Sequence, residues 1–278
     1  MISSTANPHV KRIRSLNGSS RERRRERLFV LEGVRLVAEA LTAGATLQLA
    51  LYNPEQLDST AAGQALLAHL AQQPNCYPAS ERVISVAADT VTPQGVVAVA
   101  AWPTAATIAA RPSALCLVLD TVQDPGNVGT LLRSAEAAGV GSVWSMQGSA
   151  DLYSPKVVRS AMGAHFYVPL LADQAWEALA AEAATVTAQG GAVYVATADG
   201  DLSYYSAEWR KPAILIVGNE AHGVSTAALQ LATHQLTIPM AGRGESLNAA
   251  VAGSVMLFEA LRQRTAVDQQ NGKRQTTV

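Results

Sequence analysis

Residues 113–265 alternate short apolar runs with amphipathic segments of helical length, and this alternation constrains the fold more than any other feature. Short apolar runs bounded by turn residues are typical of buried strands. We expect these strands at residues 115–120, 142–146, 193–197, 213–217 and 235–239. We expect the intervening helices at residues 127–138, 155–162, 173–189, 224–231 and 247–264. Strands separated by helices predict an α/β domain whose mostly parallel sheet carries helices on both faces.

A smaller α/β domain precedes this alternation. Its strand-like runs include residues 47–52, 83–86 and 95–102. The segment that follows is flanked by prolines and has no consistent period, so we assign it as a linker. The polar end of the chain predicts a disordered tail. The expected organisation is an amino-terminal domain over residues 1–101, a linker over 102–112, a larger domain over 113–265 and a tail over 266–278.

Positive charge is concentrated at the start of the chain. Residues 1–35 hold nine of the 21 Lys and Arg residues against three Glu, although the whole chain has a net charge of −1. This asymmetry predicts a polyanion contact in the amino-terminal domain. The alternative is that the run RERRRER forms a solvated helix of mixed charge. The basic residues expected to contact RNA are Lys11, Arg12, Arg14, Arg23, Arg24, Lys156 and Arg159.

Several classes of protein are disfavoured by what the sequence contains. Cys76 and Cys116 have no partner at metal-binding spacing, so we expect neither a zinc site nor a disulfide. The apolar runs fall far short of the ~20 residues that a membrane-spanning helix requires. The basic start lacks the apolar core of a signal peptide. We therefore expect a cytoplasmic protein without a membrane segment or a metal.

Three predicted strand ends carry unusual loops. Their sequences are DPGNVGTLLRSAEAAG at 124–139, ILIVGNEAHGV at 214–224 and LTIPMAGRGESLNAAVAGSVMLFEAL at 236–261. Each loop alone is compatible with an ordinary tight turn. Ligands of open α/β sheets bind at the carboxyl ends of strands, so three such loops together favour a shared site. The glycine spacing fits neither GxGxxG nor GxxxxGK[ST], which disfavours a nicotinamide enzyme or a nucleotide triphosphatase.

These three segments resemble the motifs of the SpoU, or TrmH-like, branch of the SPOUT RNA methyltransferases. Residues around Glu32 and Gly33 are similar to the amino-terminal substrate-binding domain of many members, and SPKVVRSAMGAHF at 154–166 resembles a further stretch, with Ala161 where Ser is common. The resemblance implies a fold with a trefoil knot, a homodimer, and methyl transfer from S-adenosylmethionine to a ribose 2′-hydroxyl of rRNA or tRNA.

The resemblance also implies roles for individual residues. We expect Arg133 to dock the RNA phosphate and stabilise the developing alkoxide, because a guanidinium is too weak an acid to serve as the general base often ascribed to it. A surface pair with Glu136 is the alternative. We expect Asn127 to cap its helix, and we expect His222, Asp120 and Asp124 to be structural. The catalytic candidates are Asn127, Arg133, Glu220, Ser246 and Asn248. The cofactor-binding candidates are Thr197, Val217, Gly218, Asn219, Ile238, Met240, Ser246 and Leu247.

Two other functions stay open at this point. A catalytically silent RNA-binding or ribosome-assembly factor could keep the same fold without turnover. A methyltransferase that modifies a base rather than a ribose is a further alternative. Binding of S-adenosylmethionine distinguishes the first alternative, and mass analysis of the product nucleoside distinguishes the second.

Overall fold

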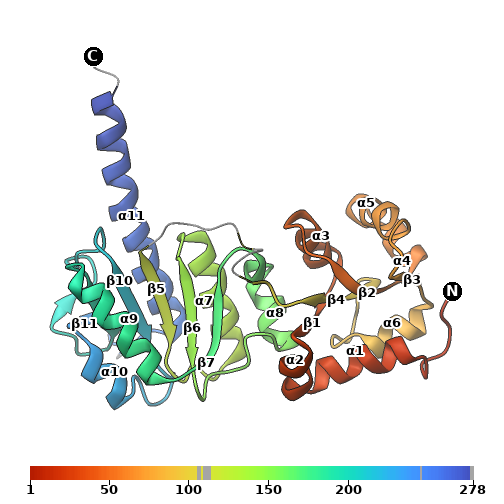
Figure 1. Cartoon of the computed structure of the whole chain (residues 1–278), viewed down its shortest axis with the longest axis horizontal. Helices are drawn as coiled ribbons and strands as arrows, with labels where there is room; N and C mark the ends of the chain where they lie inside the picture. Colours follow the sequence, from red (N-terminus) through yellow and green to blue (C-terminus); the bar gives the residue numbers. More distant parts are fainter. Residues whose placement is uncertain (105–107, 109–113, 245, 276–278) are drawn as a thin grey trace. The chain divides into compact units, whose positions relative to one another are not determined.

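The computed structural model describes residues 1–104, 108, 114–244 and 246–275, with side chains described up to residue 266 (Figure 1). The chain forms two compact units. One comprises Met1–Ile108 with Tyr153–Tyr167, and the other comprises Ala109–Leu152 with Val168–Val278. Most of the expected linker, residues 105–107 and 109–112, lies outside the described residues.

The amino-terminal unit is built on a four-stranded sheet in the order β1-β4-β2-β3. The strands are β1 (Leu28–Glu32), β2 (Leu47–Tyr52), β3 (Cys76–Pro78) and β4 (Val96–Ala101). Strand β4 pairs antiparallel with β1 and β2, whereas β2 and β3 are parallel. The helices are α1 (Pro8–Gly18), α2 (Ser20–Glu26), α3 (Val34–Thr42), α4 (Pro54–Asp58), α5 (Ala61–Leu70) and α6 (Glu81–Ala87).

The strand expected at residues 83–86 is wrong, because these residues lie in α6. Val83, Ile84 and Ala87 are fully buried at helical spacing and join the same core as α1. A run of β-branched residues favours a strand locally, but burial of one helical face outweighs that preference.

Helix α1 is part of the core rather than a loose basic arm. Asn7 caps it by accepting a hydrogen bond from the backbone N–H of His9. Val10, Ile13 and Leu16 are buried at a spacing of three residues, so one face of α1 packs against the sheet while its basic residues lie on the other.

Residues 153–167 leave the carboxyl-terminal sheet between β6 and β7 and pack in the amino-terminal unit. They contain α8 (Pro155–Ala161) and the short 3₁₀ helix η1 (Ala164–Phe166). The ring of Phe29 lies 5.2 Å from that of Tyr153 and 5.6 Å from that of His165. The hydroxyl of Tyr167 donates a hydrogen bond to Glu39. The helix expected at 155–162 therefore exists, and it packs with the unit that precedes it.

The carboxyl-terminal unit contains a seven-stranded sheet in the order β7-β6-β5-β10-β8-β11-β9. Every pair in it is parallel, which confirms the predicted α/β class. The strands are β5 (Leu115–Leu119), β6 (Ser142–Met146), β7 (Leu170–Gln174), β8 (Ala192–Ala196), β9 (Leu202–Ser203), β10 (Ala213–Val217) and β11 (His234–Thr237). The edge strands β7 and β9 are additions to the five that the pattern predicts.

Helices cover both faces of this sheet (Figure 1). They are α7 (Pro125–Ala137), α9 (Trp176–Ala188), α10 (Thr226–Leu231) and α11 (Ala249–Gln275). Ile214 and Ile216 of β10 share a buried cluster with α9 and α10. Val217 faces the other side, where a Cβ on Gly253 of α11 would lie 2.6 Å from Leu131 of α7 and 3.0 Å from Val217. Gly253 thus allows α11 to pack closely against both α7 and β10.

The end of the chain differs from expectation. Residues 266–275, expected to be disordered, continue the backbone of α11 to Gln275, and residues 276–278 lie outside the described part. Glutamine, arginine and lysine are good helix formers, so a polar sequence can prolong a helix that is already nucleated by packing. No helix among the described residues is long and apolar enough to cross a membrane.

Candidate active site

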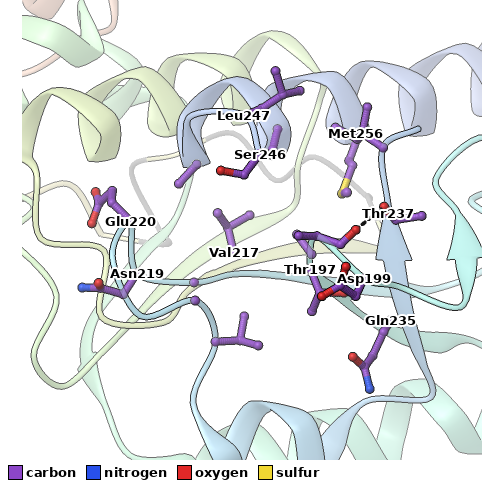
Figure 2. Close-up of a pocket in the computed structure, with 18 of the residues that line it drawn as sticks. Thr197, Asp199, Val217, Asn219, Glu220, Gln235, Thr237, Ser246, Leu247 and Met256 are labelled. Carbon is purple, nitrogen blue, oxygen red and sulfur yellow. Dashed lines mark hydrogen bonds between the residues drawn. The ribbon is translucent and has the colours of Figure 1, made fainter. Parts of the chain in front are cut away.

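A pocket of about 480 Å³ lies at the carboxyl ends of β8, β10 and β11 (Figure 2). The loops after these strands and the start of α11 form its walls. Its lining brings together all of the residues expected to bind a cofactor, namely Thr197, Val217, Gly218, Asn219, Ile238, Met240, Ser246 and Leu247. Ligand pockets of this kind combine apolar walls with a few placed polar groups.

Several lining residues were not expected from the sequence. They include Asp199, Gln235, Thr237 and Met256. The loop after β8 reads as an ordinary turn, and Met256 lies on a helix face that periodicity assigns to the core. The only signal was topological: a parallel sheet places the end of β8 next to the ends of β10 and β11.

The loop after β10 is held by backbone contacts that demand glycine. Asn219 and Gly223 exchange two backbone hydrogen bonds of 2.8 and 2.9 Å. A Cβ on Gly218 would lie 2.5 Å from the carbonyl of Gly223, and Gly223 itself has a φ of +71°. Such contacts and positive φ values exclude larger side chains. This wall of the pocket therefore has a fixed shape.

Asn219 ties this loop to the loop after β5. Its side-chain amide donates to the carbonyl oxygen of Thr121 at 2.8 Å, and its side-chain oxygen accepts from the backbone N–H groups of Ala221 and His222. All polar atoms of this nearly buried side chain are thus used. Asn219 is placed to shape the loop, while His222 is exposed at the edge of the pocket.

Asp124, rather than the expected Asn127, caps α7. The carboxylate of Asp124 accepts a hydrogen bond from the backbone N–H of Asn127 at 2.9 Å. Proline at the first helical position makes Asp124 the natural cap, because proline begins helices well and acidic residues favour helix starts. The side chain of Asn127 is thereby left for another role.

The side chain of Asn127 connects the start of α7 with the loop after β10 and with the start of α11. Its amide donates to the carboxylate of Glu220 at 2.9 Å, and its side-chain oxygen accepts from the amide of Asn248 at 3.0 Å. Asn248 also caps α11, since its side-chain oxygen accepts from the backbone N–H groups of Ala250 and Val251. We call Asn127, Glu220 and Asn248 the polar network. It connects three loops that are far apart in the sequence.

Glu220 is an ionised hydrogen-bond acceptor in this network. Besides Asn127, it accepts from the backbone N–H groups of Gln123 and Asp124 at 3.3 and 3.2 Å. Partial burial acts to raise the pKa of Glu220, but these hydrogen bonds outweigh it and the pKa lies below the usual range. A carboxylate held in this way is suited to positioning the start of α7.

Arg133 lies apart from these contacts. It is exposed on α7 and is not part of the pocket lining. Within the described part of the chain, no hydrogen bond or ion pair involves Arg133, so the alternative pair with Glu136 is not formed. Ser246, the remaining catalytic candidate, lines the pocket beside Leu247 (Figure 2).

Asp120 has the structural role that was expected. It is fully buried at the end of β5, and its carboxylate accepts from the backbone N–H of Ser225 at 2.6 Å. Ser225 in turn caps α10. Asp120 therefore joins the end of β5 to the start of α10 rather than facing the pocket.

The basic residues expected to contact RNA differ in exposure and in their protein partners. Arg23 is 5% exposed and donates to the backbone carbonyls of Leu16 and Asn17 at the end of α1, so its guanidinium is structural rather than an RNA contact. Arg12 pairs with Glu26 at 2.9 Å and Arg159 with Asp89 at 2.8 Å. The exposed members of the predicted set are Lys11, Arg12, Arg14, Arg24 and Lys156.

Comparison with known proteins matches both units. The sequence profile of the SpoU rRNA Methylase family matches residues 114–258, and that of an MRM3-like substrate binding domain matches residues 7–98. The chain is 34% identical to the Bacillus subtilis 23S rRNA (guanosine(2553)-2′-O)-methyltransferase RlmP, over 92% of this chain and 97% of that protein. It is 31% identical to the 23S rRNA (uridine(2479)-2′-O)-methyltransferase of Streptomyces viridochromogenes, over 93% and 91% of the two chains.

Solved structures give the same result. The SpoU methyltransferase AviRb from Streptomyces viridochromogenes, in complex with S-adenosylmethionine, aligns with a TM-score of 0.82 at 28% identity, covering 93% of this chain and 98% of that one. An S-adenosylmethionine-bound rRNA methyltransferase from Sinorhizobium meliloti aligns with a TM-score of 0.77 at 31% identity, over 94% and 97% of the chains.

The pocket fits this cofactor. Val217, Ile238 and Met256 supply apolar walls, and the hydroxyl of Thr197 is buried without a hydrogen-bond partner among the described residues. Among those residues there is also no cluster of three or more His, Cys, Asp or Glu side chains that could hold a metal ion. The chain belongs to the SpoU rRNA methylase family of S-adenosylmethionine-dependent RNA methyltransferases.

Proposed function

We propose that this chain methylates a ribose 2′-hydroxyl in ribosomal RNA. The observation that carries the proposal is the polar network, which joins the two loops of the pocket to the start of the helix that bears Arg133. Relatives that align over nearly the whole chain, the amino-terminal unit included, are named as 23S rRNA 2′-O-methyltransferases. This supports ribosomal rather than transfer RNA as the substrate.

S-adenosylmethionine supplies an electrophilic methyl group on its sulfonium. The protein has to hold that group in line with the ribose oxygen and keep water away, which can contribute ~7–11 kcal/mol to lowering the barrier. Thr197, Gly218 and Leu247 are proposed to hold the cofactor through side-chain and main-chain hydrogen bonds. Ser246 and Asn248 lie at the junction of the pocket with the polar network and are proposed to orient the ribose.

Arg133 is proposed to bind the phosphate next to the target ribose. A guanidinium presents paired donors that match a phosphate and stays protonated at working pH. Its charge also stabilises the negative charge that develops on the ribose oxygen as that oxygen loses its proton. Glu220 is proposed to position Asn127 and the start of α7 rather than to move a proton, because its pKa is lowered and its oxygens are engaged.

We propose that the enzyme is a homodimer in which Arg133 faces the pocket of the partner subunit. Two observations support this. Arg133 is exposed and outside its own pocket lining, and the exposed surface of α11 carries Val251 and Phe258 with 47% and 48% of their surface accessible. These two residues are seven positions apart and therefore share one face of α11, and a contiguous apolar face commonly marks an interface. Light scattering at working concentration tests this, and a monomer that retains full activity would contradict it.

The expected trefoil knot and cytoplasmic location are also part of this proposal. The knot is supported by the sheet order, in which β10 lies between β5 and β8, and by the pocket, which is lined both by the loop after β10 and by the segment after β11. Threading of the chain end through a loop would place these two segments side by side.

Methyl transfer from labelled S-adenosylmethionine to deproteinised ribosomal RNA tests the proposed function. We expect incorporation into ribosomal RNA and none into transfer RNA. A catalytically silent RNA-binding factor would incorporate nothing into either RNA. That alternative is not favoured, because the pocket retains its full set of expected residues and the relatives are named as methyltransferases.

A further inference from the structure

The turn after β8 is held rigidly against β11. The backbone N–H of Thr197 donates to the carbonyl oxygen of Leu236 at 2.9 Å, and the hydroxyl of Thr237 donates to the carbonyl oxygen of Ala198 at 2.8 Å. A Cβ on Gly200 would lie 2.5 Å from the backbone oxygen of Gln235. The backbone of this turn is therefore fixed on both sides of the residue at its tip.

That residue is Asp199, whose side chain lines the pocket without a protein partner. Within the described part of the chain, no hydrogen bond or ion pair involves Asp199. Asp201, two residues later, differs in both respects: its carboxylate accepts from the backbone N–H of Gln235 at 3.0 Å, and it does not line the pocket. The turn thus uses one aspartate to hold its shape and presents the other to the cavity.

The pocket carries negative charge and no fixed positive charge among its described lining residues. Asp199 and Glu220 are the two carboxylates, and His222 is the one other titratable side chain. Figure 2 shows Asp199 and Glu220 on different sides of the cavity, with Val217 between them. Glu220 is already satisfied by uncharged donors, whereas Asp199 is not. A cation within such a pocket is attracted more strongly than a neutral group of the same shape.

We propose that Asp199 is a specificity-determining residue that recognises the positive charge of the methylated cofactor and so favours its binding over that of the demethylated product. S-adenosylmethionine and S-adenosylhomocysteine share their adenosine, ammonium and carboxylate groups and differ by the methyl group and the sulfonium charge. Methyl transfer removes that charge, so the attraction to Asp199 falls when the reaction is complete. The inference rests on the proposed function in that it takes this pocket as the cofactor site.

Calorimetric titration of three proteins with three ligands tests the proposal. The proteins are the wild type, Asp199→Asn and the matched control Asp201→Asn, in which the amide oxygen can still accept the hydrogen bond from Gln235. The ligands are S-adenosylmethionine, S-adenosylhomocysteine and sinefungin, which bears an amine in place of the methylated sulfur. We expect Asp199→Asn to weaken binding of S-adenosylmethionine and sinefungin about fivefold and that of S-adenosylhomocysteine less than about twofold. Asp201→Asn should leave the ratios unchanged.

Other results would overturn the inference. Equal weakening of all three ligands would mean that Asp199 binds a shared group such as the ribose hydroxyls. Unchanged affinities would mean that Asp199 does not face the cofactor, and equal effects of both substitutions would mean that only overall charge matters. Thermal unfolding of each variant shows whether it is folded. Failure of the folded wild type to bind S-adenosylmethionine at all would instead contradict the assignment of the pocket.

Discussion

Around the pocket of the carboxyl-terminal unit, polar side chains form hydrogen bonds with backbone groups and with one another. On α1 and α2, by contrast, arginines bind carboxylates and the backbone carbonyls at the end of α1. Asn127 and Asn219 each bridge two loops. Arg12 and Arg25 pair with glutamates of α2, and Arg23 closes the end of α1. The carboxyl-terminal unit thus leaves Arg133 and Asp199 unpaired among the described residues, while Arg12, Arg23 and Arg25 of the basic segment have protein partners.

This difference shows that residue type alone is a weak indicator of function. A guanidinium in a charge-rich helix finds carboxylates nearby, so a count of basic residues overstates the charge offered to RNA. A polar side chain at the end of a parallel strand is directed to one edge of the sheet by topology. Motifs at strand ends are therefore the more reliable guide.

The strongest test of the pocket side of this comparison is Arg133→Ala. The substitution removes the guanidinium that we propose binds the phosphate and stabilises the developing alkoxide, so we expect methyl transfer to fall about 10²-fold or more. Affinity for S-adenosylmethionine should be unchanged, because Arg133 is exposed and outside the pocket lining. Arg133→Lys keeps the charge but not the paired donors and should recover only part of the rate. Single-turnover transfer and calorimetry measure the two quantities. A normal rate in Arg133→Ala would remove Arg133 from the catalytic assignment.

Gly218→Ala should reduce cofactor binding about tenfold or more. The added methyl group would lie 2.5 Å from the backbone of Gly223, which forces the loop after β10 to move, and overpacking of this kind costs ~1–3 kcal/mol. Gly242→Ala is the matched control, since a Cβ there meets nothing within 4 Å. Calorimetric titration with S-adenosylmethionine checks both. Equal affinities in the two variants would show that the loop shape does not matter.

Arg23→Ala should lower the free energy of unfolding by about 1.5–3 kcal/mol, because it removes charged hydrogen bonds to buried carbonyls at the end of α1. Arg21→Ala, at an exposed position of the same helix, is the control and should change the free energy of unfolding by less than about 0.5 kcal/mol. Urea unfolding gives both values. If the two variants are equally stable, the structural role of Arg23 is wrong.

The double substitution Lys11→Gln and Arg14→Gln should weaken RNA binding without changing stability. Both side chains are exposed on α1, opposite its buried face. If each contacts one phosphate, the slope of log affinity against log salt should fall by about 1.4–1.8. Filter binding at several salt concentrations measures the slope. An unchanged slope would mean that RNA does not contact this face of α1.

Glu220→Gln should change the stability of the fold by the smallest amount, and this change should depend on pH. The pKa of Glu220 is lowered in the folded protein, so the carboxylate stabilises the fold above its unfolded pKa of ~4.3 and this contribution is lost as the pH falls through the lower folded pKa. The wild type should therefore be more stable than Glu220→Gln at pH 7 and lose that advantage in acid. Thermal unfolding across this range tests it. A difference that is constant with pH would contradict an ionised Glu220.

The sequence predicts most of the catalytic unit because its signals are local. The five central strands follow from apolar runs, and most of the pocket-lining residues that we expected to bind the cofactor follow from the motifs at the strand ends. Asp199 was missed because its turn has no distinctive composition, and only the pairing of β8 with β10 and β11 places it beside the pocket.

The remaining differences between the expectation and the structure concern α7 and α8. The cap of α7 is Asp124, not Asn127, which the proline at the first helical position already indicates, whereas the contacts of Asn127 with Glu220 and Asn248 join loops that are distant in the sequence. The helical pattern of residues 155–162 predicts α8 but cannot show that α8 packs against β1 and that its Arg159 pairs with Asp89 in the amino-terminal unit. The periodicity of apolar residues in one segment does not indicate which distant segment it contacts.

One measurement tests the central claim most directly. Ribosomal RNA treated with the purified protein and labelled S-adenosylmethionine is digested to nucleosides, and the labelled product is identified by mass. We predict a single 2′-O-methylated nucleoside, formed about 10²-fold or more slowly when Arg133→Ala replaces the wild type. A label on a base, or ribose methylation at the wild-type rate in Arg133→Ala, would contradict the account.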